Sequence, residues 1–248
     1  MEPEPLRTAL QKLGIKLPSP AENSGKNQEK DSFPENEPTK EPCQTHSVPM
    51  KLIGRNSPEW WCKAMNLDIT HHALVGRMAL FCGSFLSHAI RNESESTKWL
   101  VIEGGVGVGK SHASRWVIRA FNDWIWDFIL AGHTRWGAAR KPSAGFVNWS
   151  KFCLREERDE NEFTLNDHLA CDLLVIDDVG AEADRFKNGA HQARLRDFLE
   201  DCRNKWVIIN TNVEAKSWQK IFGQRVADRL DSARHCDMTG VESYRRKK

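Results

Sequence analysis

The 248-residue sequence lacks both a Cys-x-x-Cys pair and an even set of cysteines. Its seven scattered cysteines indicate reduced thiols in a cytoplasmic protein, rather than a disulfide framework or a zinc site. Cys62 with His71 and His72 is only a weak candidate for a metal site. The sequence also lacks a run of about 18 apolar residues and a signal-peptide core, so we expect no membrane span. Basic residues (36) nearly balance acidic ones (34), so any contact with nucleic acid needs a local patch.

Proline and tryptophan divide the chain into two parts. Eight of the ten prolines fall within the first 50 residues, and all ten tryptophans follow residue 59. Residues 18–49 have almost no apolar side chains, so burial cannot offset the entropy of ordering them. We therefore expect residues 1–50 to be a largely disordered tail. Within this tail, leucines recur at helical spacing over residues 6–17, which fits either a fraying helix or a segment that docks onto a partner.

Strand-like and helix-like stretches alternate after residue 51. Four short strands are expected, at 99–102, 146–149, 173–176 and 206–209. Helices are expected within a leading segment at about 58–92, with Thr70 as a cap, and over 114–130 and 192–203. Strands alternating with helices predict a parallel sheet covered on both faces, and runs such as LLVI fit strands buried on both sides. The sequence therefore predicts a doubly wound α/β domain over residues 51–248.

A glycine-rich loop follows the first predicted strand. The sequence GGVGVGKS has the spacing G-x-x-x-x-G-K-[ST], in which glycines let backbone N–H groups converge on phosphate oxygens. The following helix adds its positive N-terminal end. We expect Lys110 to reach the β- and γ-phosphates of ATP, and the Ser111 hydroxyl to bind Mg²⁺. The predicted nucleotide-contacting residues are Gly104, Gly105, Val106, Gly107, Val108, Gly109, Lys110, Ser111 and His112.

Polar side chains end the third and fourth predicted strands. The run LLVIDD places Asp177 and Asp178 directly after four aliphatic residues, at the edge of the sheet where the phosphate loop lies. Asp177 is expected to hold Mg²⁺ through its water shell, and Asp178 to orient or deprotonate the attacking water. Asn212 follows the next strand, where an amide can position that water. These three residues therefore complete a predicted hydrolytic site.

Two arginines lie four residues apart in the sequence GQRVADRLDSA. Arg225 and Arg229 share one face of a predicted helix. One reading is a solvated basic helix in which Asp228 and Asp231 are local ion partners. The other is an arginine finger that stabilises transition-state charge in a neighbouring subunit's ATP site. A finger supplied in this way implies that hydrolysis requires self-assembly.

Taken together, GGVGVGKS, LLVIDDVGAE, VIINTNV and RVADRL resemble the DnaC/IstB-like branch of the AAA+ ATPases over about residues 70–245. The resemblance implies that Asn212 matches the sensor-1 position and Arg229 the arginine finger. The sequence departs from the full AAA+ pattern after Arg229, because the remaining residues are too few for the helical lid of many relatives. Arg245, in the ending SYRR, is similar to a serine-aromatic-arginine element of this branch and is a candidate nucleotide contact.

This resemblance implies an ATPase that loads or remodels a replicative DNA helicase on single-stranded DNA. One alternative is an IstB-like transposition helper on duplex DNA. Another is a nucleotide-gated scaffold with little turnover, which the two adjacent aspartates disfavour. A cationic loop after the predicted helix at 114–130 offers DNA contacts. It also fits a solvated loop whose tryptophan folds back into the core. This loop contains Arg135, Trp136, Arg140 and Lys141.

Overall fold

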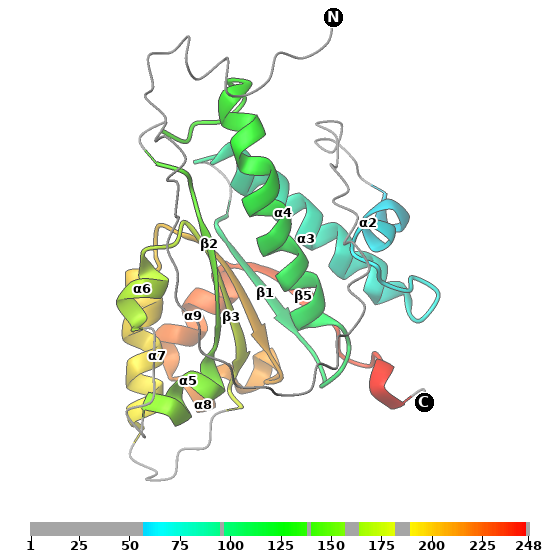
Figure 1. Cartoon of the computed structure of the whole chain (residues 1–248). Coiled ribbons are helices and arrows are strands. Elements are labelled where there is room, and N and C mark those ends of the chain that lie inside the picture. The colour runs from blue at the N-terminus through cyan, green and yellow to red at the C-terminus, as the bar shows by residue number, and fades with distance from the viewer. Residues whose placement is uncertain (1–56, 95–96, 138–139, 157–163, 182–188, 247–248) are drawn as a thin grey trace, which may run out of the picture. The chain divides into compact units, whose positions relative to one another are not determined.

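The computed structural model describes residues 57–94, 97–137, 140–156, 164–181 and 189–246. The expected tail and its segment at 6–17 therefore lie outside the described residues. Five parallel strands form one sheet in the order β2-β3-β4-β1-β5 (Figure 1). The strands are β1 (Trp99–Glu103), β2 (Ala144–Asn148), β3 (Leu173–Val179), β4 (Trp206–Thr211) and β5 (Arg234–Asp237). The predicted parallel α/β architecture is confirmed.

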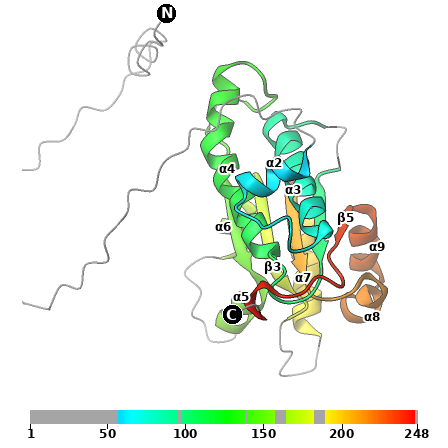
Figure 2. The same ribbon diagram turned by 90° about the vertical axis from the view of Figure 1, so that its right-hand side faces the viewer.

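Helices cover both faces of the sheet (Figures 1 and 2). One face packs against α2 (Pro58–Ala64), α3 (Ala73–Arg91) and α4 (Lys110–Leu130). The opposite face packs against four further helices, and α6 (Leu165–Leu169) lies beside β2. These four are α5 (Trp149–Glu156), α7 (Ala190–Asp201), α8 (Trp218–Phe222) and α9 (Gln224–Ser232). Two single-turn 3₁₀ helices, η2 (Ala215–Ser217) and η3 (Tyr244–Arg246), complete the described elements.

Successive side chains of a strand point to opposite faces of the sheet, and helices cover both faces here. These strands are therefore apolar throughout. Leu100 and Ile102 of β1 belong to the core under α3 and α4, whereas Val101 between them belongs to the core under α7 and α9. All five residues of β1 and all six of β4 are buried. A strand between two helical layers has no face left for water, so its sequence shows no polar alternation.

Helix α3 is long and apolar enough to cross a membrane by length and composition, but 56% of its most apolar window is buried within the fold. A core helix meets the same criterion. Its Gly83 lies directly under the indole of Trp61, which is 1% exposed; a Cβ added at this glycine would lie 2.2 Å from two ring carbons. The glycine therefore allows α2 to pack closely on α3.

Several predicted boundaries were wrong. His72, not Thr70, caps α3, because its Nδ1 accepts the Leu74 N–H at 3.1 Å. Helix α4 begins at Lys110 rather than 114, directly after the glycine loop, and α7 spans 190–201 rather than 192–203. Strand β2 spans 144–148, so Trp149 starts α5 instead of ending a strand. The strands at 173 and 206 extend further than expected, to Val179 and Thr211.

The fifth strand, β5, had no counterpart in the prediction. Its four residues, RHCD, are mostly polar, and only Cys236 is fully buried. Because β5 lies at the edge of the sheet and pairs only with β1, it needs few apolar side chains. After β5 the described chain contains one further element, η3.

Candidate functional site

The glycine loop connects the carboxyl end of β1 to the first turn of α4, as the phosphate-binding reading requires. Gly104, Gly107 and Gly109 have φ values of 148°, 82° and 99°, which L side chains rarely adopt. Close approach adds a second constraint, because a Cβ at Gly104 would lie 2.6 Å from the Met238 side chain. The loop therefore needs glycine both for its backbone shape and for its fit against the segment after β5.

The Lys110 ammonium group is buried inside the curve of this loop, with 6% of the residue exposed. It donates to the carbonyl oxygens of Gly104 (2.6 Å) and Gly105 (2.8 Å), and to Oδ1 of Asn212 (2.8 Å). Burial lowers the pKa of Lys110 to about 8, although Asp177 and Asp178 oppose this shift. All three donors of the ammonium thus have acceptors within the chain, and phosphate oxygens would replace them.

Ser111 and Asp177 meet beside the first turn of α4. The Ser111 hydroxyl donates to Asp177 Oδ1 at 2.8 Å, and the Asn210 side chain donates to the same oxygen at 2.8 Å. Asn210 also accepts from Ser114 Oγ at 3.0 Å, so the carboxylate is held from two sides. Asp177 is 2% exposed. An adjacent hydroxyl and carboxylate fit Mg²⁺, which takes few protein oxygens and completes its shell with phosphates and water.

Asp178 has an unusual backbone conformation, with a left-handed φ of 57°. The pairing of β3 with β4 shifts register between Ile176 and Val179, so the chain bulges at this point. At this bulge Oδ2 of Asp178 accepts a 2.6 Å hydrogen bond from Nδ2 of Asn148. Asn148 ends β2, and its side chain therefore orients the predicted catalytic carboxylate.

The segment before α3 and the end of the chain both pack against the phosphate loop. Nε2 of His112 lies 2.6 Å from the Met65 carbonyl, so this predicted nucleotide contact also anchors the segment after α2. Tyr244 donates its N–H to the Gly107 carbonyl at 3.0 Å and stacks on His71 with ring centres 4.0 Å apart. Burial raises the pKa of Tyr244 to about 12. Arg245 follows and lines the same cavity, as the SYRR ending predicts.

These elements enclose one cavity of about 860 Å³. Its lining includes the loop from Val106 to His112, the carboxylates of Asp177 and Asp178, and the side chains of Asn148 and Asn212. The loop follows β1, whose neighbours in the sheet are β4 and β5, and the acidic pair ends β3. The parallel sheet, with the glycine loop between β1 and α4, is a P-loop α/β fold. The predicted parallel α/β fold is therefore confirmed, and the predicted site residues from Val106 to His112, with Asp177, Asp178 and Asn212, line a common cavity, whereas Gly104, Gly105 and Arg229 do not line it.

Comparison with known proteins gives matches only among solved structures; no family model and no curated protein matches. A crystal structure of the DnaC helicase loader is similar with a TM-score of 0.48 and 18% identity, over 67% of this chain and 90% of that chain. A crystal structure of DnaI has a TM-score of 0.47 and 17% identity, over 78% and 93%. AMPPCP-bound DnaA from Aquifex aeolicus has a TM-score of 0.44 and 17% identity, but this chain spans only 45% of that one.

Arg229 lies at the other end of the sheet. Helix α9 leads into β5, whose first residue, Arg234, pairs with Leu100 near the start of β1, whereas the phosphate loop follows the end of β1. Arg229 lines a separate cleft there and forms an ion pair with Glu200. Arg225 forms an ion pair with the same carboxylate at 2.8 Å. Neither arginine therefore reaches the cavity at the phosphate loop of the same chain.

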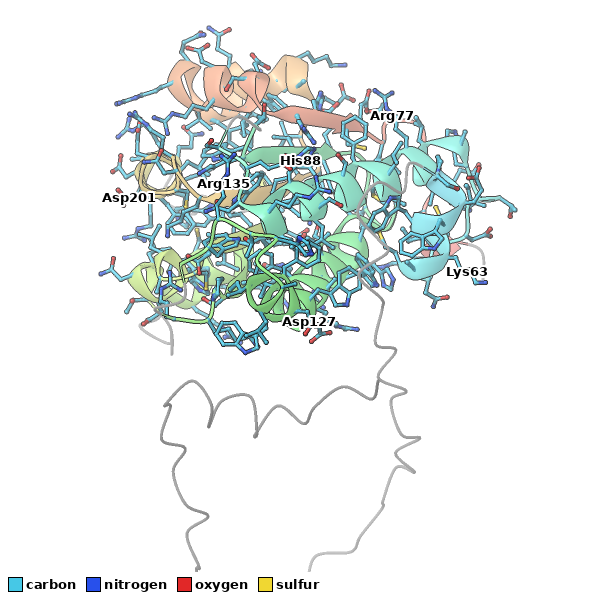
Figure 3. The ribbon with its side chains drawn as sticks, turned by 90° about the horizontal axis from the view of Figure 1, so that it is seen from above. Lys63, Arg77, His88, Asp127, Arg135 and Asp201 are labelled. Carbon is cyan, nitrogen blue, oxygen red and sulfur yellow. The ribbon has the colours of Figure 1, made fainter. Side chains whose placement is uncertain are left out.

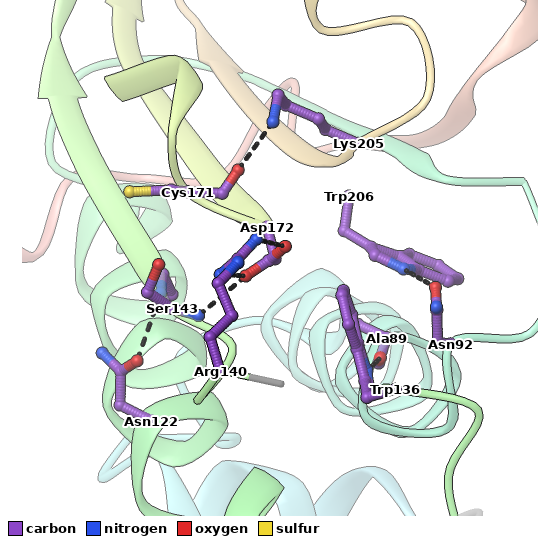
Figure 4. A network of polar contacts seen from close by, with 11 residues as sticks. Ala89, Asn92, Asn122, Trp136, Arg140, Ser143, Cys171, Asp172, Lys205 and Trp206 are labelled. Carbon is purple, nitrogen blue, oxygen red and sulfur yellow. Dashed lines mark hydrogen bonds and ion pairs between the residues drawn. The ribbon is translucent and has the colours of Figure 1, made fainter. Parts of the chain in front are cut away.

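The cationic loop after α4 folds back onto the domain (Figure 4). The Trp136 indole donates to the Ala89 carbonyl at 3.0 Å and packs edge-on against Phe121. Arg140 makes a bidentate pair with Asp172, at 2.6 and 2.7 Å. Arg135 contacts the Ser94 hydroxyl at 3.1 Å. Trp136 is half-buried against the core, as one of the two readings predicts, whereas Arg135, Arg140 and Lys141 are exposed, and contact of this loop with DNA stays a prediction.

Sequence reasoning did not single out Asn148, Asn210 or Glu103. Glu103 is 5% exposed at the end of β1, where it accepts from the Ala215 N–H at 2.8 Å and pairs with His235 at 3.1 Å. It thereby links the segment after β4 and strand β5 to the base of the phosphate loop. All three residues are polar and lie at the end of an apolar strand. The same pattern in the sequence predicted Asp177, Asp178 and Asn212, and it could have identified these three as well.

Proposed function

We propose that this protein is a DnaC-like ATPase that binds ATP with Mg²⁺ and hydrolyses it in an assembled state. The observation that carries the proposal is the single cavity into which the phosphate loop, the two aspartates and Asn212 all converge. Such a combination of a phosphate cradle, a site for a divalent cation and a carboxylate poised for water supports hydrolysis over simple binding.

Each residue has a distinct part in the proposed reaction. Lys110 leaves the carbonyls of its own loop and binds the β- and γ-phosphates, while loop N–H groups hold the remaining oxygens. Ser111 and Asp177 hold Mg²⁺, which neutralises phosphate charge when bound. Asp178, oriented by Asn148, accepts a proton from the attacking water. Asn212 is released by Lys110 and positions that water.

The location of Arg229 supports hydrolysis by an oligomer. A finger at the opposite end of β1 cannot act on its own subunit's nucleotide, but it can act on that of a neighbour. Mixing Arg229→Ala protein with Asp178→Asn protein should therefore restore part of the activity, because some interfaces pair an intact finger with an intact cavity. A mixture that stays inactive under conditions where assembly is measured would contradict this role.

Lys110→Ala gives the direct test of the cavity. It should abolish binding of a fluorescent ATP analogue, because the ammonium provides the main positive charge for the phosphates. Lys63→Ala is the matched control, since this lysine is exposed on α2 and points away from the domain (Figure 3). Equal nucleotide affinity of the two variants would contradict the assignment of the phosphate loop.

The proposed output is loading or remodelling of a replicative DNA helicase on single-stranded DNA in the cytoplasm. This step rests on the resemblance of the motifs to the DnaC/IstB-like branch. A pull-down from the source cell, with the full chain and with a chain lacking residues 1–50, tests the partner. Recovery of a replicative helicase supports the proposal, whereas recovery of a transposase favours the IstB-like alternative. An absence of ATP turnover at high protein concentration would favour the scaffold alternative.

A further inference from the structure

Glu200, at the end of α7, is surrounded by three arginines. It pairs with Arg203 at 3.0 Å and with Arg225 at 2.8 Å, and its contact with Arg229 is closer still. Arg229 is the largest influence that lowers the pKa of the Glu200 carboxyl, which is therefore ionised at neutral pH. One carboxylate is thus shared by three guanidinium groups, and the cluster keeps an excess of positive charge.

Arg229 differs from the other two arginines in its surroundings. Its side chain is only 20% exposed, compared with 66% for Arg203 and 67% for Arg225. Both of its terminal nitrogens have acceptors within the subunit, because Nη2 contacts Glu200 and Nη1 donates to the Leu199 carbonyl at 3.2 Å. In the isolated chain Arg229 is therefore held against α7 rather than extended.

The side chain nevertheless has a route to an external anion. Arg229 lines a cleft of about 490 Å³ that opens to solvent and is shared with Lys98 and Arg203. An anion that enters this cleft meets cations on several sides. Phosphate suits them especially, because a guanidinium group can donate two parallel hydrogen bonds to it.

Because Glu200 has two other arginine partners, the free energy needed to release Arg229 is small. Breaking an ion pair is strongly unfavourable when it leaves one charge without a partner. Here Glu200 would keep Arg203 and Arg225, so its carboxylate would stay neutralised after Arg229 turned away. A charged phosphate in turn offers Arg229 a bidentate replacement for the carboxylate.

We propose that Glu200 is a latch that holds Arg229 within its own subunit until the phosphates of a nucleotide bound to a neighbouring copy replace the carboxylate. This inference rests on the proposed function of Arg229. Glu200 is a positioning residue, since it acts through Arg229 and touches no nucleotide. The latch opposes assembly and keeps the isolated subunit inactive. Its predicted effect is therefore on the protein concentration needed for activity, and not on the rate of the assembled enzyme.

The experiment measures ATP turnover and ATP-dependent self-association over a range of protein concentrations. Glu200→Gln should lower the concentration for half-maximal turnover by at least roughly threefold to fivefold, because the Arg229–Glu200 pair, with side chains 20% and 22% exposed, contributes no less than an exposed ion pair. The maximal rate per subunit should stay unchanged. Asp201→Asn is the matched control, because this exposed acid is next in the same helix and points outward (Figure 3). It should leave the half-maximal concentration where it is in the wild type.

A second variant tests the latch in the opposite direction. Replacing Arg203 and Arg225 together with glutamine leaves Arg229 as the partner of Glu200 in this cluster, so release should become harder and the half-maximal concentration should rise. A lower maximal rate for Glu200→Gln, or equal shifts in Glu200→Gln and Asp201→Asn, would overturn the latch. A double variant of Arg203 and Arg225 that assembles as readily as the wild type would also overturn the latch. This test holds even if Glu200→Gln fails to fold. If the wild type itself shows no turnover, the proposed function fails instead.

Discussion

Replacing Asp178 with asparagine changes the charge of the candidate catalytic group and little else. The residue has φ 57°, a left-handed conformation that asparagine adopts as readily as aspartate. The amide oxygen of the new side chain can still accept the hydrogen bond from Asn148 Nδ2, which is 2.6 Å long in the native protein. The backbone bulge between Ile176 and Val179 should therefore persist.

The expected effect on turnover follows from the loss of a proton acceptor. A positioned general base contributes roughly a hundredfold to ten-thousandfold to a rate, so kcat should fall by that factor. This corresponds to about 3–5 kcal/mol of transition-state stabilisation. Affinity for ATP should be equal or slightly higher, because one negative charge near the phosphates has been removed.

Two further substitutions separate backbone strain from chemistry. Asp178→Gly should also lose turnover but keep stability, since glycine adopts positive φ without strain. Asp178→Ala should lose turnover and in addition about 1 kcal/mol of unfolding free energy, because alanine has neither the freedom of glycine nor the short polar side chain that lets aspartate adopt the left-handed conformation. Urea unfolding provides the stabilities, and a coupled phosphate-release assay with a fluorescent-nucleotide titration provides kcat and affinity. An Asp178→Asn protein with native kcat, or an alanine variant as stable as the glycine variant, would refute the reasoning.

Three other predictions concern the phosphate loop, the core and the cationic loop. Because burial lowers the pKa of Lys110 to about 8, the lysine loses its proton above that pH. Phosphates bind the charged form of the lysine. ATP affinity should therefore fall by about tenfold per pH unit above pH 8. Lys110→Arg, which stays charged, should flatten this dependence in the same titration. Gly83→Ala should lower the unfolding free energy by about 1–2 kcal/mol, because the clash with Trp61 exceeds the gain in helix propensity; a gain in Tm would contradict this. Arg140→Ala should leave affinity for single-stranded DNA unchanged in fluorescence anisotropy, because its guanidinium is paired with Asp172. It should cost less than about 1 kcal/mol of stability, since its side chain is 60% exposed.

Local patterns were sufficient for most of the sheet and for the core of the site. Runs such as LLVI and VIIN predicted buried strands because a strand between two helical layers has no polar face. The glycine loop and the acidic pair were predicted because each is contiguous in sequence and its chemistry requires those residue types in that order. The edge strand β5 was missed for the opposite reason, since its polar residues need no burial at the edge of the sheet.

By itself, the sequence determined the α/β fold class, the phosphate loop at Gly104–Ser111 and the carboxylates that face it, because these depend on neighbours along the chain. Tertiary structure alone decided which distant side chains join them. Asn148 lies 30 residues from Asp178 in sequence, and the Tyr244 hydroxyl reaches a carbonyl 176 residues away, at Asp68. It also decided that Arg229 rests against Glu200, far from its own phosphate loop. Such pairs carry no periodic signal, because hydrogen bonds and ion pairs between elements depend on how helices and strands pack.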